Sequence, residues 1–189
     1  MKILFIHGLA SSGAYKMASS LRILFKPCVV IAPVVPIEPK EAMELLKNLC
    51  ETENPDLVVG LSLGGFWAQK LRGRKKLLVN PDFHVSRLMR TMIGEREYLS
   101  PRQDGALTFT ITEEMCNEYE ALEKTEFDGL SEDEISLTSG AFADHDELVR
   151  CKDEFDLHYP GQGYSYPGKH LPNFPELKQH IKPIIDTIL

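Results

Sequence analysis

The sequence has no hydrophobic run approaching the length of about 20 apolar residues that a membrane-spanning helix requires. Its opening, residues 1–6, is too short and turns polar too soon for a secretory signal peptide. Basic side chains are also in the minority, which gives the 189 residues a net charge of −7. This charge argues against nucleic acid or an anionic membrane as the main partner. We therefore expect a cytoplasmic protein that binds neither nucleic acid nor membrane.

Paired metal-binding or redox cysteines are also missing. The sequence has four cysteines, and no two of them have Cys-x-x-Cys or zinc-type spacing: Cys28, Cys50, Cys116 and Cys151. Without a signal peptide, reduced thiols are the favoured state. Cys28 and Cys50 lie in apolar patterns, where a free cysteine behaves as a small hydrophobic residue, so we expect both in the core. No metal site is expected.

The length of the chain fits one domain. Apolar runs predict strands that alternate with helical patterns along the chain. The predicted strands are residues 2–6, 28–32, 56–60, 75–80, 134–139 and a short one near Tyr164, and the predicted helices are residues 17–25, 39–51, 63–72, 147–158 and a terminal helix opened by Pro172 or Pro175. This alternation predicts a three-layer α/β/α sandwich with a mostly parallel sheet.

Residues 83–130 interrupt the alternation with scattered methionines and aromatic residues among polar ones. The pattern predicts an insertion with one or two helices, of which residues 113–124 are the clearest. An excursion between core strands often forms a lid over a site. A plain pair of surface helices fits the pattern equally well.

The functional signal lies at Gly60-Leu61-Ser62-Leu63-Gly64, between a predicted strand and a predicted helix. Gly-x-Ser-x-Gly in that setting is the pattern of a nucleophile elbow, a tight turn that lifts a serine hydroxyl clear of the sheet. The flanking positions are small because larger side chains would collide in such a turn. The alternative is a glycine-rich turn with Ser62 as an ordinary helix N-cap.

The chain fits neither of two nucleotide-binding patterns that its glycines suggest. Gly8 and Gly13 have the spacing of a phosphate-binding loop after a first strand, but Ala14 and Tyr15 occupy the places of its lysine and its metal-holding hydroxyl. At the elbow, Ser62 occupies the place of the second glycine of a dinucleotide fingerprint.

A serine nucleophile needs a base, which is usually a histidine oriented by a carboxylate. The elbow fold has the chain order serine, acid, histidine. His170 suits the base because it falls in a loop after the last predicted strand and before the terminal helix. His7, at the end of the first strand, is expected to shape the oxyanion loop rather than to transfer protons. The remaining histidines, His84, His145, His158 and His180, have weaker claims.

The acid should follow the fifth predicted strand, where Asp144 and Asp146 both qualify. Asp146 is preferred because Leu148 and Val149 can anchor its turn, and Asp144 is the runner-up. Asp82, after the fourth strand, is a third option. Each of the three aspartates is alternatively a solvated turn or N-cap residue.

An oxyanion hole needs two N–H donors aimed at the developing charge. The backbone N–H of Leu63, at a helix N-terminus, is the first candidate. The second is the N–H of Leu9, which follows His7-Gly8 at the end of the first strand, where Gly8 lets the backbone come close.

The chain resembles the α/β-hydrolase superfamily, and more narrowly its small bacterial YqiA-type esterases. The motifs that carry the resemblance are His7-Gly8, Ser11-Ser12, residues 59–66, Val79-Asn80-Pro81, residues 146–149 and residues 168–170. It covers the core but not residues 83–130, and Leu9 replaces the phenylalanine that commonly follows His-Gly. The resemblance implies a reduced core without the first two strands of larger members. It also implies hydrolysis of short-chain acyl esters, or thioesters, without a cofactor, and it supports Asp146 over Asp144.

Together these features predict a serine esterase that acts on a small-molecule acyl ester. A binding protein with a vestigial triad is one alternative. An acyltransferase that uses the same serine is another, because both enzymes pass through the same acyl-enzyme.

Overall fold

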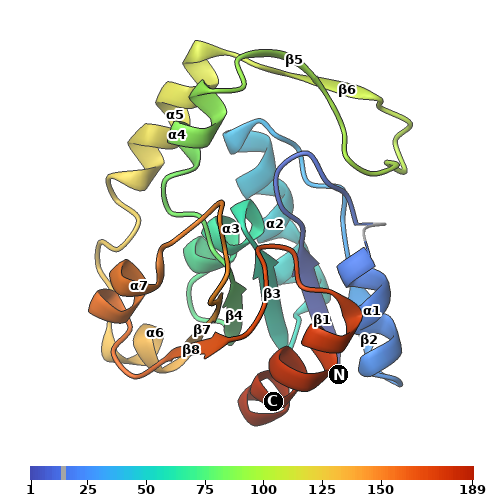
Figure 1. The fold of residues 1–189 in the computed structure, drawn as a ribbon, viewed down its shortest axis with the longest axis vertical. Helices are drawn as coiled ribbons and strands as arrows, with labels where there is room; N and C mark the ends of the chain where they lie inside the picture. Colours follow the sequence, from blue (N-terminus) through green and yellow to red (C-terminus); the bar gives the residue numbers. More distant parts are fainter. Residues whose placement is uncertain (14–15) are drawn as a thin grey trace.

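A computed structural model describes residues 1–13 and 16–189 (Figure 1). Ala14 and Tyr15, on which the comparison with a phosphate-binding loop rested, lie outside the described residues. In this part of the chain, six strands form a parallel sheet in the order β2-β1-β3-β4-β7-β8. They are β1 (Lys2–Ile6), β2 (Val29–Ile31), β3 (Leu57–Leu61), β4 (Lys76–Val79), β7 (Thr138–Ala143) and β8 (Gly163–Tyr166). The predicted parallel sheet is confirmed.

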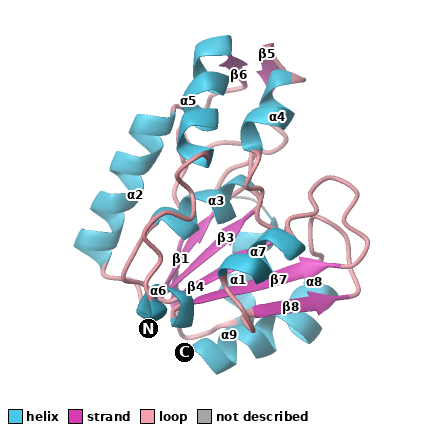
Figure 2. Ribbon diagram, turned by 90° about the vertical axis from the view of Figure 1, so that its left-hand side faces the viewer, coloured by secondary structure: helices cyan, strands magenta, loops and turns pink. Residues whose placement is uncertain are grey.

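Helices cover both faces of this sheet (Figure 2). One face packs against α1 (Lys16–Leu24) and the C-terminal helices, and the other packs against α2 (Pro39–Glu53), α3 (Leu63–Lys70) and α7 (Lys152–His158). Strand β1 shows why its sequence is apolar throughout: Ile3 and Phe5 enter one core, while Leu4 and Ile6 enter the other. A strand that is buried on both faces cannot alternate with polar residues.

The sheet has a switch point between β1 and β3, which are neighbours although the chain leaves β1 to form β2 on the other side. In open α/β sheets, the crevice at such a point, beyond the carboxyl ends of the strands, is where ligands bind. The loop after β1 and the turn after β3 both lie at this crevice.

The predicted insertion is only partly helical. Its helices are α4 (Val85–Arg90) and α5 (Glu113–Glu123), and between them β5 (Gly94–Glu97) and β6 (Thr108–Ile111) form an antiparallel hairpin that the prediction missed. Figure 1 shows this hairpin arching over the end of the molecule where the strands end. The alternation within β6, with Phe109 and Ile111 buried and Thr108 and Thr110 exposed, is a strand pattern.

The strand predicted at residues 134–139 is wrong in position. Residues Glu132–Ser136 form the short helix α6, and β7 begins only at Thr138. The side chain of Ser131 accepts a hydrogen bond from Glu134 N at 3.2 Å, which caps the helix. Three acidic residues in the first turn add favourable charge at that N-terminus.

Two C-terminal predictions also need adjustment. The helix predicted at residues 147–158 begins at Lys152, and the residues before it form turns around Asp146. The terminal helix begins with α8 (Phe174–Glu176), which places Pro175 rather than Pro172 in its first turn, and continues as the π-helical η1 (Leu177–Ile181) and α9 (Lys182–Ile188). Pro183 has no N–H for an i→i−4 bond, and a local π turn accommodates such a defect.

The burial of the cysteines and the length of the helices bear on two predictions made from composition. Cys50 is buried as expected, whereas Cys28 is only partly buried at the edge of a core. No helix in the described part of the chain combines the length and apolarity needed to cross a membrane.

Candidate active site

Ser62 occupies the turn between β3 and α3 in a strained backbone conformation. Its φ is +56° and its ψ is −119°, in the left-handed half of the map that L-residues avoid. Its backbone N–H bonds to Val79 O at 3.0 Å, and its carbonyl accepts bonds from the start of α3. The side chain forms no capping hydrogen bond. The conformation therefore differs from that of an ordinary N-cap serine, which has extended backbone angles and caps its helix.

The two elbow glycines allow close packing of the turn. A Cβ on Gly60 would overlap the carbonyl of Gly64, and a Cβ on Gly64 would overlap the carbonyl of Ile6. A Cβ on Gly8 would lie 3.3 Å from Ser62 Cβ and 3.9 Å from its Oγ. The loop after β1 therefore lies directly beside the serine, with backbone rather than side chain facing it.

Asp146 and His170 form a buried pair. His170 Nδ1 lies 2.7 Å from Asp146 Oδ2, and the two residues are 8% and 4% exposed. The other carboxylate oxygen, Oδ1, accepts the backbone N–H groups of Leu148 at 2.8 Å and Val149 at 2.9 Å. Thus the turn that follows Asp146 fixes its carboxylate, and the carboxylate in turn fixes the imidazole.

The charge state of Asp146 follows from these contacts. Burial raises the pKa of its carboxyl group, but the hydrogen bonds from His170, Val149 and Leu148 outweigh that effect and hold the pKa below its ordinary value. An ionised carboxylate only accepts hydrogen bonds, so His170 must carry a proton on Nδ1. When the imidazole is neutral, its Nε2 then has a free lone pair and can act as a base.

Asn80 is a site residue to which sequence reasoning gave no role. Its Nδ2 donates to His170 O at 2.8 Å and to Tyr166 Oη at 2.9 Å, and its Oδ1 accepts from Ala143 N at 2.7 Å. One side chain at the end of β4 therefore connects β7, β8 and the histidine loop. The backbone of Asn80 has a left-handed φ of +44°, which asparagine tolerates better than most residues. An asparagine directly after a strand was the available sequence signal, but it does not reveal the contacts.

The other two candidate acids have hydrogen-bond partners other than His170, although the charge of a protonated His170 would act on Asp82. Asp144 is exposed, and its backbone N–H pairs with Tyr166 O. Asp82 is 7% exposed, its carboxylate accepts His84 N at 2.9 Å, and its backbone N–H donates to Ser62 O at 3.3 Å. Burial raises the pKa of Asp82. Among the described residues, only Asp146 of the three aspartates is hydrogen-bonded to His170.

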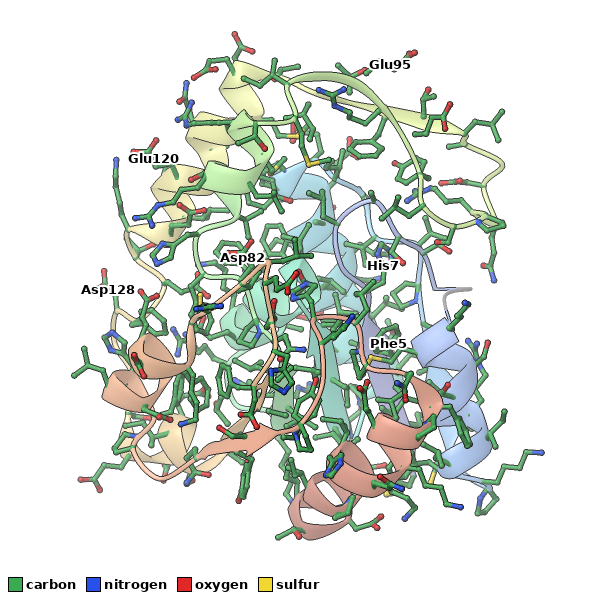
Figure 3. The ribbon with its side chains drawn as sticks, viewed as in Figure 1. Phe5, His7, Asp82, Glu95, Glu120 and Asp128 are labelled. Atoms are coloured by element: carbon green, nitrogen blue, oxygen red, sulfur yellow. The ribbon has the colours of Figure 1, made fainter. Side chains whose placement is uncertain are left out.

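His7 is a fixed neutral histidine that holds two loops together. Its Nδ1 donates to Gly8 O at 2.9 Å, and its Nε2 accepts from Val35 N at 3.0 Å. Burial lowers the pKa of His7 to about 4. Figure 3 labels His7 and Asp82 at the same level, between the sheet and the overlying hairpin.

The two predicted oxyanion donors border one pocket. Leu9 and Leu63 both line a narrow pocket of about 20 Å³ beside Gly8. Leu63 is the first residue of α3, so its N–H has no acceptor within the helix. A larger cavity of about 880 Å³ lies between α2 and α5, but its lining contains none of the predicted site residues.

The remaining histidines have other contacts. His84 pairs with Glu154 at 2.8 Å, His158 stacks on Phe127, and His180 stacks on Tyr166. His145 is exposed. Among the described residues, no group of three or more His, Cys, Asp or Glu side chains is arranged to hold a metal ion.

The sheet order, the helices on both faces and the elbow after β3 define the α/β-hydrolase fold. Solved structures that share this fold align with nearly the whole chain. The monoacylglycerol lipase of Paleococcus ferrophilus aligns with a TM-score of 0.66 at 12% identity and covers 99% of this chain and 93% of its own. A methylesterase of Arabidopsis aligns with a TM-score of 0.62 at 10% identity and covers 99% of both chains.

The chain belongs to the family described as Uncharacterised protein family UPF0227, whose model matches residues 2–156. This agrees with the resemblance to YqiA-type proteins. A UPF0227 protein of Shewanella oneidensis is 29% identical over 106 residues. That alignment covers 50% of this chain and 59% of the relative, so the chain spans about three fifths of the curated relative's length.

Proposed function

We propose that this protein is a serine hydrolase that cleaves carboxylic esters, including thioesters, with Ser62 as nucleophile, His170 as base and Asp146 as the orienting acid. The observation that carries the proposal is the buried 2.7 Å contact between His170 Nδ1 and Asp146 Oδ2. It fixes the tautomer that leaves Nε2 free to accept a proton. The strained conformation of Ser62 supports the same assignment because such strain is typical of a nucleophile elbow.

The acylation step needs a proton acceptor and a stabilised oxyanion. His170 Nε2 takes the proton of Ser62 while Oγ attacks the acyl carbon and the carbonyl π electrons move to oxygen. The N–H groups of Leu9 and Leu63 are the proposed donors to that oxygen. Collapse of the tetrahedral intermediate breaks the bond to the alcohol or thiol, which leaves with the proton from His170.

Deacylation repeats the sequence with water. His170 removes a proton from water, the resulting hydroxide oxygen attacks the acyl-enzyme, and the serine oxygen leaves and regains the proton. The product is a carboxylic acid, and Asp146 holds the imidazole throughout. No redox step occurs in this cycle, and every proton is returned.

The proposal is tested with p-nitrophenyl butyrate and a fluorophosphonate probe on the wild type and on Ser62→Ala. We expect the wild type to hydrolyse the ester and to be labelled at Ser62, and the variant to lose both properties while it keeps its circular dichroism spectrum. Ser136→Ala is the matched control, since this exposed serine on α6 lies outside the site.

Three results distinguish the alternatives. Hydrolysis by Ser62→Ala at the wild-type rate would refute the proposal. A folded wild type that neither hydrolyses nor reacts with the probe would indicate a binding protein. Labelling without hydrolysis, together with transfer of the butyryl group to an added alcohol, would indicate an acyltransferase.

A further inference from the structure

The β5–β6 hairpin is attached to the loop after β1. Leu99 N–H donates to Ala10 O at 2.7 Å, and Ser12 Oγ donates to Pro101 O at 2.7 Å. In Figure 1, the turn of the hairpin descends toward this loop. These bonds bring residues 98–102 of the insertion to the pocket that Leu9 and Leu63 line.

Arg102 is a partly buried residue whose cationic side chain lines that pocket. Its side chain is only 6% exposed, and its guanidinium lies 4.2 Å from the centre of the Tyr98 ring. Asp104 accepts from Nε at 3.1 Å and from Nη2 at 2.7 Å. Nη1 has no hydrogen-bond partner among the described residues, so part of the guanidinium is available to a further acceptor.

Ser11 supplies a second and independent observation. It is 7% exposed, lines the same pocket, and its hydroxyl has no hydrogen-bond partner in the described part of the chain. A buried polar group without a partner costs about 1–3 kcal/mol. An unpaired hydroxyl that lines the same pocket as a cationic side chain therefore indicates a position suited to a polar ligand atom.

The unpaired end of Arg102 favours an acceptor with negative charge. Arg102 is a cation among the described lining residues of the pocket, and Asp104, which lies outside that lining, pairs with its Nε and Nη2, so Nη1 is the part of the guanidinium left for a ligand oxygen. His7 adds no charge at neutral pH because burial lowers its pKa to about 4. The volume of about 20 Å³ accommodates one water-sized group, which is too small for a hydrocarbon chain but suits the oxygen of an anionic head.

We propose that Arg102 and Ser11 bind an anionic oxygen of the substrate beside the reacting carbonyl, so that the protein prefers esters carrying a carboxylate or phosphate. This inference rests on the proposed ester hydrolysis and adds the class of ester. Arginine suits the role because its planar N–H groups match the oxygens of such anions.

The experiment compares two matched pairs of esters, because the anion can belong to either side of the scissile bond. In the first pair the acyl group carries the charge: mono-p-nitrophenyl glutarate against p-nitrophenyl methyl glutarate. In the second the leaving group carries it: para-carboxyphenyl butyrate against its methyl ester. We expect the wild type to prefer the anionic member of one pair by about tenfold or more in kcat/KM.

The variants assign this preference to the pocket. Arg102→Gln should lower the ratio of anionic to neutral kcat/KM by about tenfold, Ser11→Ala should lower it less, and Arg102→Lys should retain part of it. Arg96→Gln is the control, because this exposed arginine of the same hairpin loses the same charge and bonds only to carbonyls of its own segment. Arg96→Gln should leave the ratio of anionic to neutral kcat/KM unchanged, and also the kcat/KM of each ester.

Several outcomes would overturn the inference. One is a wild type that hydrolyses both neutral esters through Ser62 but shows no preference in either pair; the proposed function would then stand. A preference that survives Arg102→Gln in a folded protein, or that Arg96→Gln removes equally, would also overturn it. If Arg102→Gln fails to fold, the inference is still tested by the wild-type ratios of anionic to neutral kcat/KM and by the folded Arg102→Lys variant, in which an undiminished ratio would overturn it. Undiminished hydrolysis by Ser62→Ala would refute the proposed function and with it this inference.

Discussion

Asp146→Asn should remove most of the activity without disturbing the turn. The carbonyl oxygen of the new amide can still accept the N–H groups of Leu148 and Val149, as Oδ1 does now at 2.8 and 2.9 Å. The amide nitrogen would then face His170 Nδ1, where a carboxylate oxygen lies at 2.7 Å. Because an amide N–H cannot accept a hydrogen bond, the imidazole would adopt the tautomer with its proton on Nε2. That tautomer cannot deprotonate Ser62.

The size of the loss follows from the comparison with an enzyme whose triad is established. In chymotrypsin-like proteases, the same substitution lowers kcat about 10⁴-fold, or about 5.5 kcal/mol in the activation free energy. We expect a loss of about 10³-fold or more in kcat for p-nitrophenyl butyrate near pH 7.5. KM should change much less, since Asp146 does not contact the substrate.

Asp144→Asn provides the matched control, because it is the same substitution two positions away at an exposed residue. It should retain wild-type kcat. If Asp146→Asn retains more than about a tenth of wild-type kcat, the orienting role is wrong. A large loss in Asp144→Asn would instead favour the runner-up acid.

Three further predictions concern stability. Ser62→Gly should be more stable than Ser62→Ala by about 1 kcal/mol in urea unfolding, because glycine adopts a φ of +56° without strain; equal stabilities would contradict the strain. Gly64→Ala should lower the free energy of unfolding by about 3 kcal/mol or prevent folding, because the new Cβ would overlap Ile6 O. A urea-unfolding midpoint equal to that of the wild type would disprove this. His7 is neutral in the folded protein down to about pH 4, whereas the unfolded chain takes up the proton below about pH 6.5. The contribution of His7 to the free energy of unfolding should therefore fall by about 3 kcal/mol as the pH drops through that window. His7→Gln should flatten this dependence, and an unchanged slope would refute the assignment.

The core of the fold was predictable because two-sided burial leaves a clear mark on sequence. Strands such as β1 are apolar throughout, and glycine or proline stops most of them. The elbow was predictable because the tight turn itself requires small residues: a Cβ on Gly60 would overlap Gly64 O within the motif, whereas the contact of Gly64 with Ile6 O is long-range and only the motif spacing indicated it. The order of Asp146 and His170 along the chain then followed from the fold, and the structure brings these two side chains together.

The errors arose where local patterns compete. Ile135 and Leu137 alternate with polar residues as in a strand, yet capping by Ser131 and the acidic first turn of α6 favour a helix over residues 132–136. The β5 strand, Gly94–Glu97, is mostly charged and exposed, so it has no apolar alternation to reveal it. It becomes a strand because β6 pairs with it, and long-range pairing of this kind cannot be read from one segment.

The role of Asn80 was out of reach for a related reason. Its partners lie as far as 90 positions away, and nothing near Asn80 in the sequence specifies them. Arg102 was missed as well, because its position beside the oxyanion loop depends on how the hairpin docks.

The contacts of Asn80 bear on how the protein should respond to heat. Its amide links the histidine loop to Tyr166 of β8, and β8 is the last strand at one edge of the sheet. Edge strands have a neighbour on one side only and separate at lower free energies than central ones. On warming, the imidazole should thus lose its alignment while the rest of the sheet is still intact, so that catalytic inactivation precedes the calorimetric melting transition.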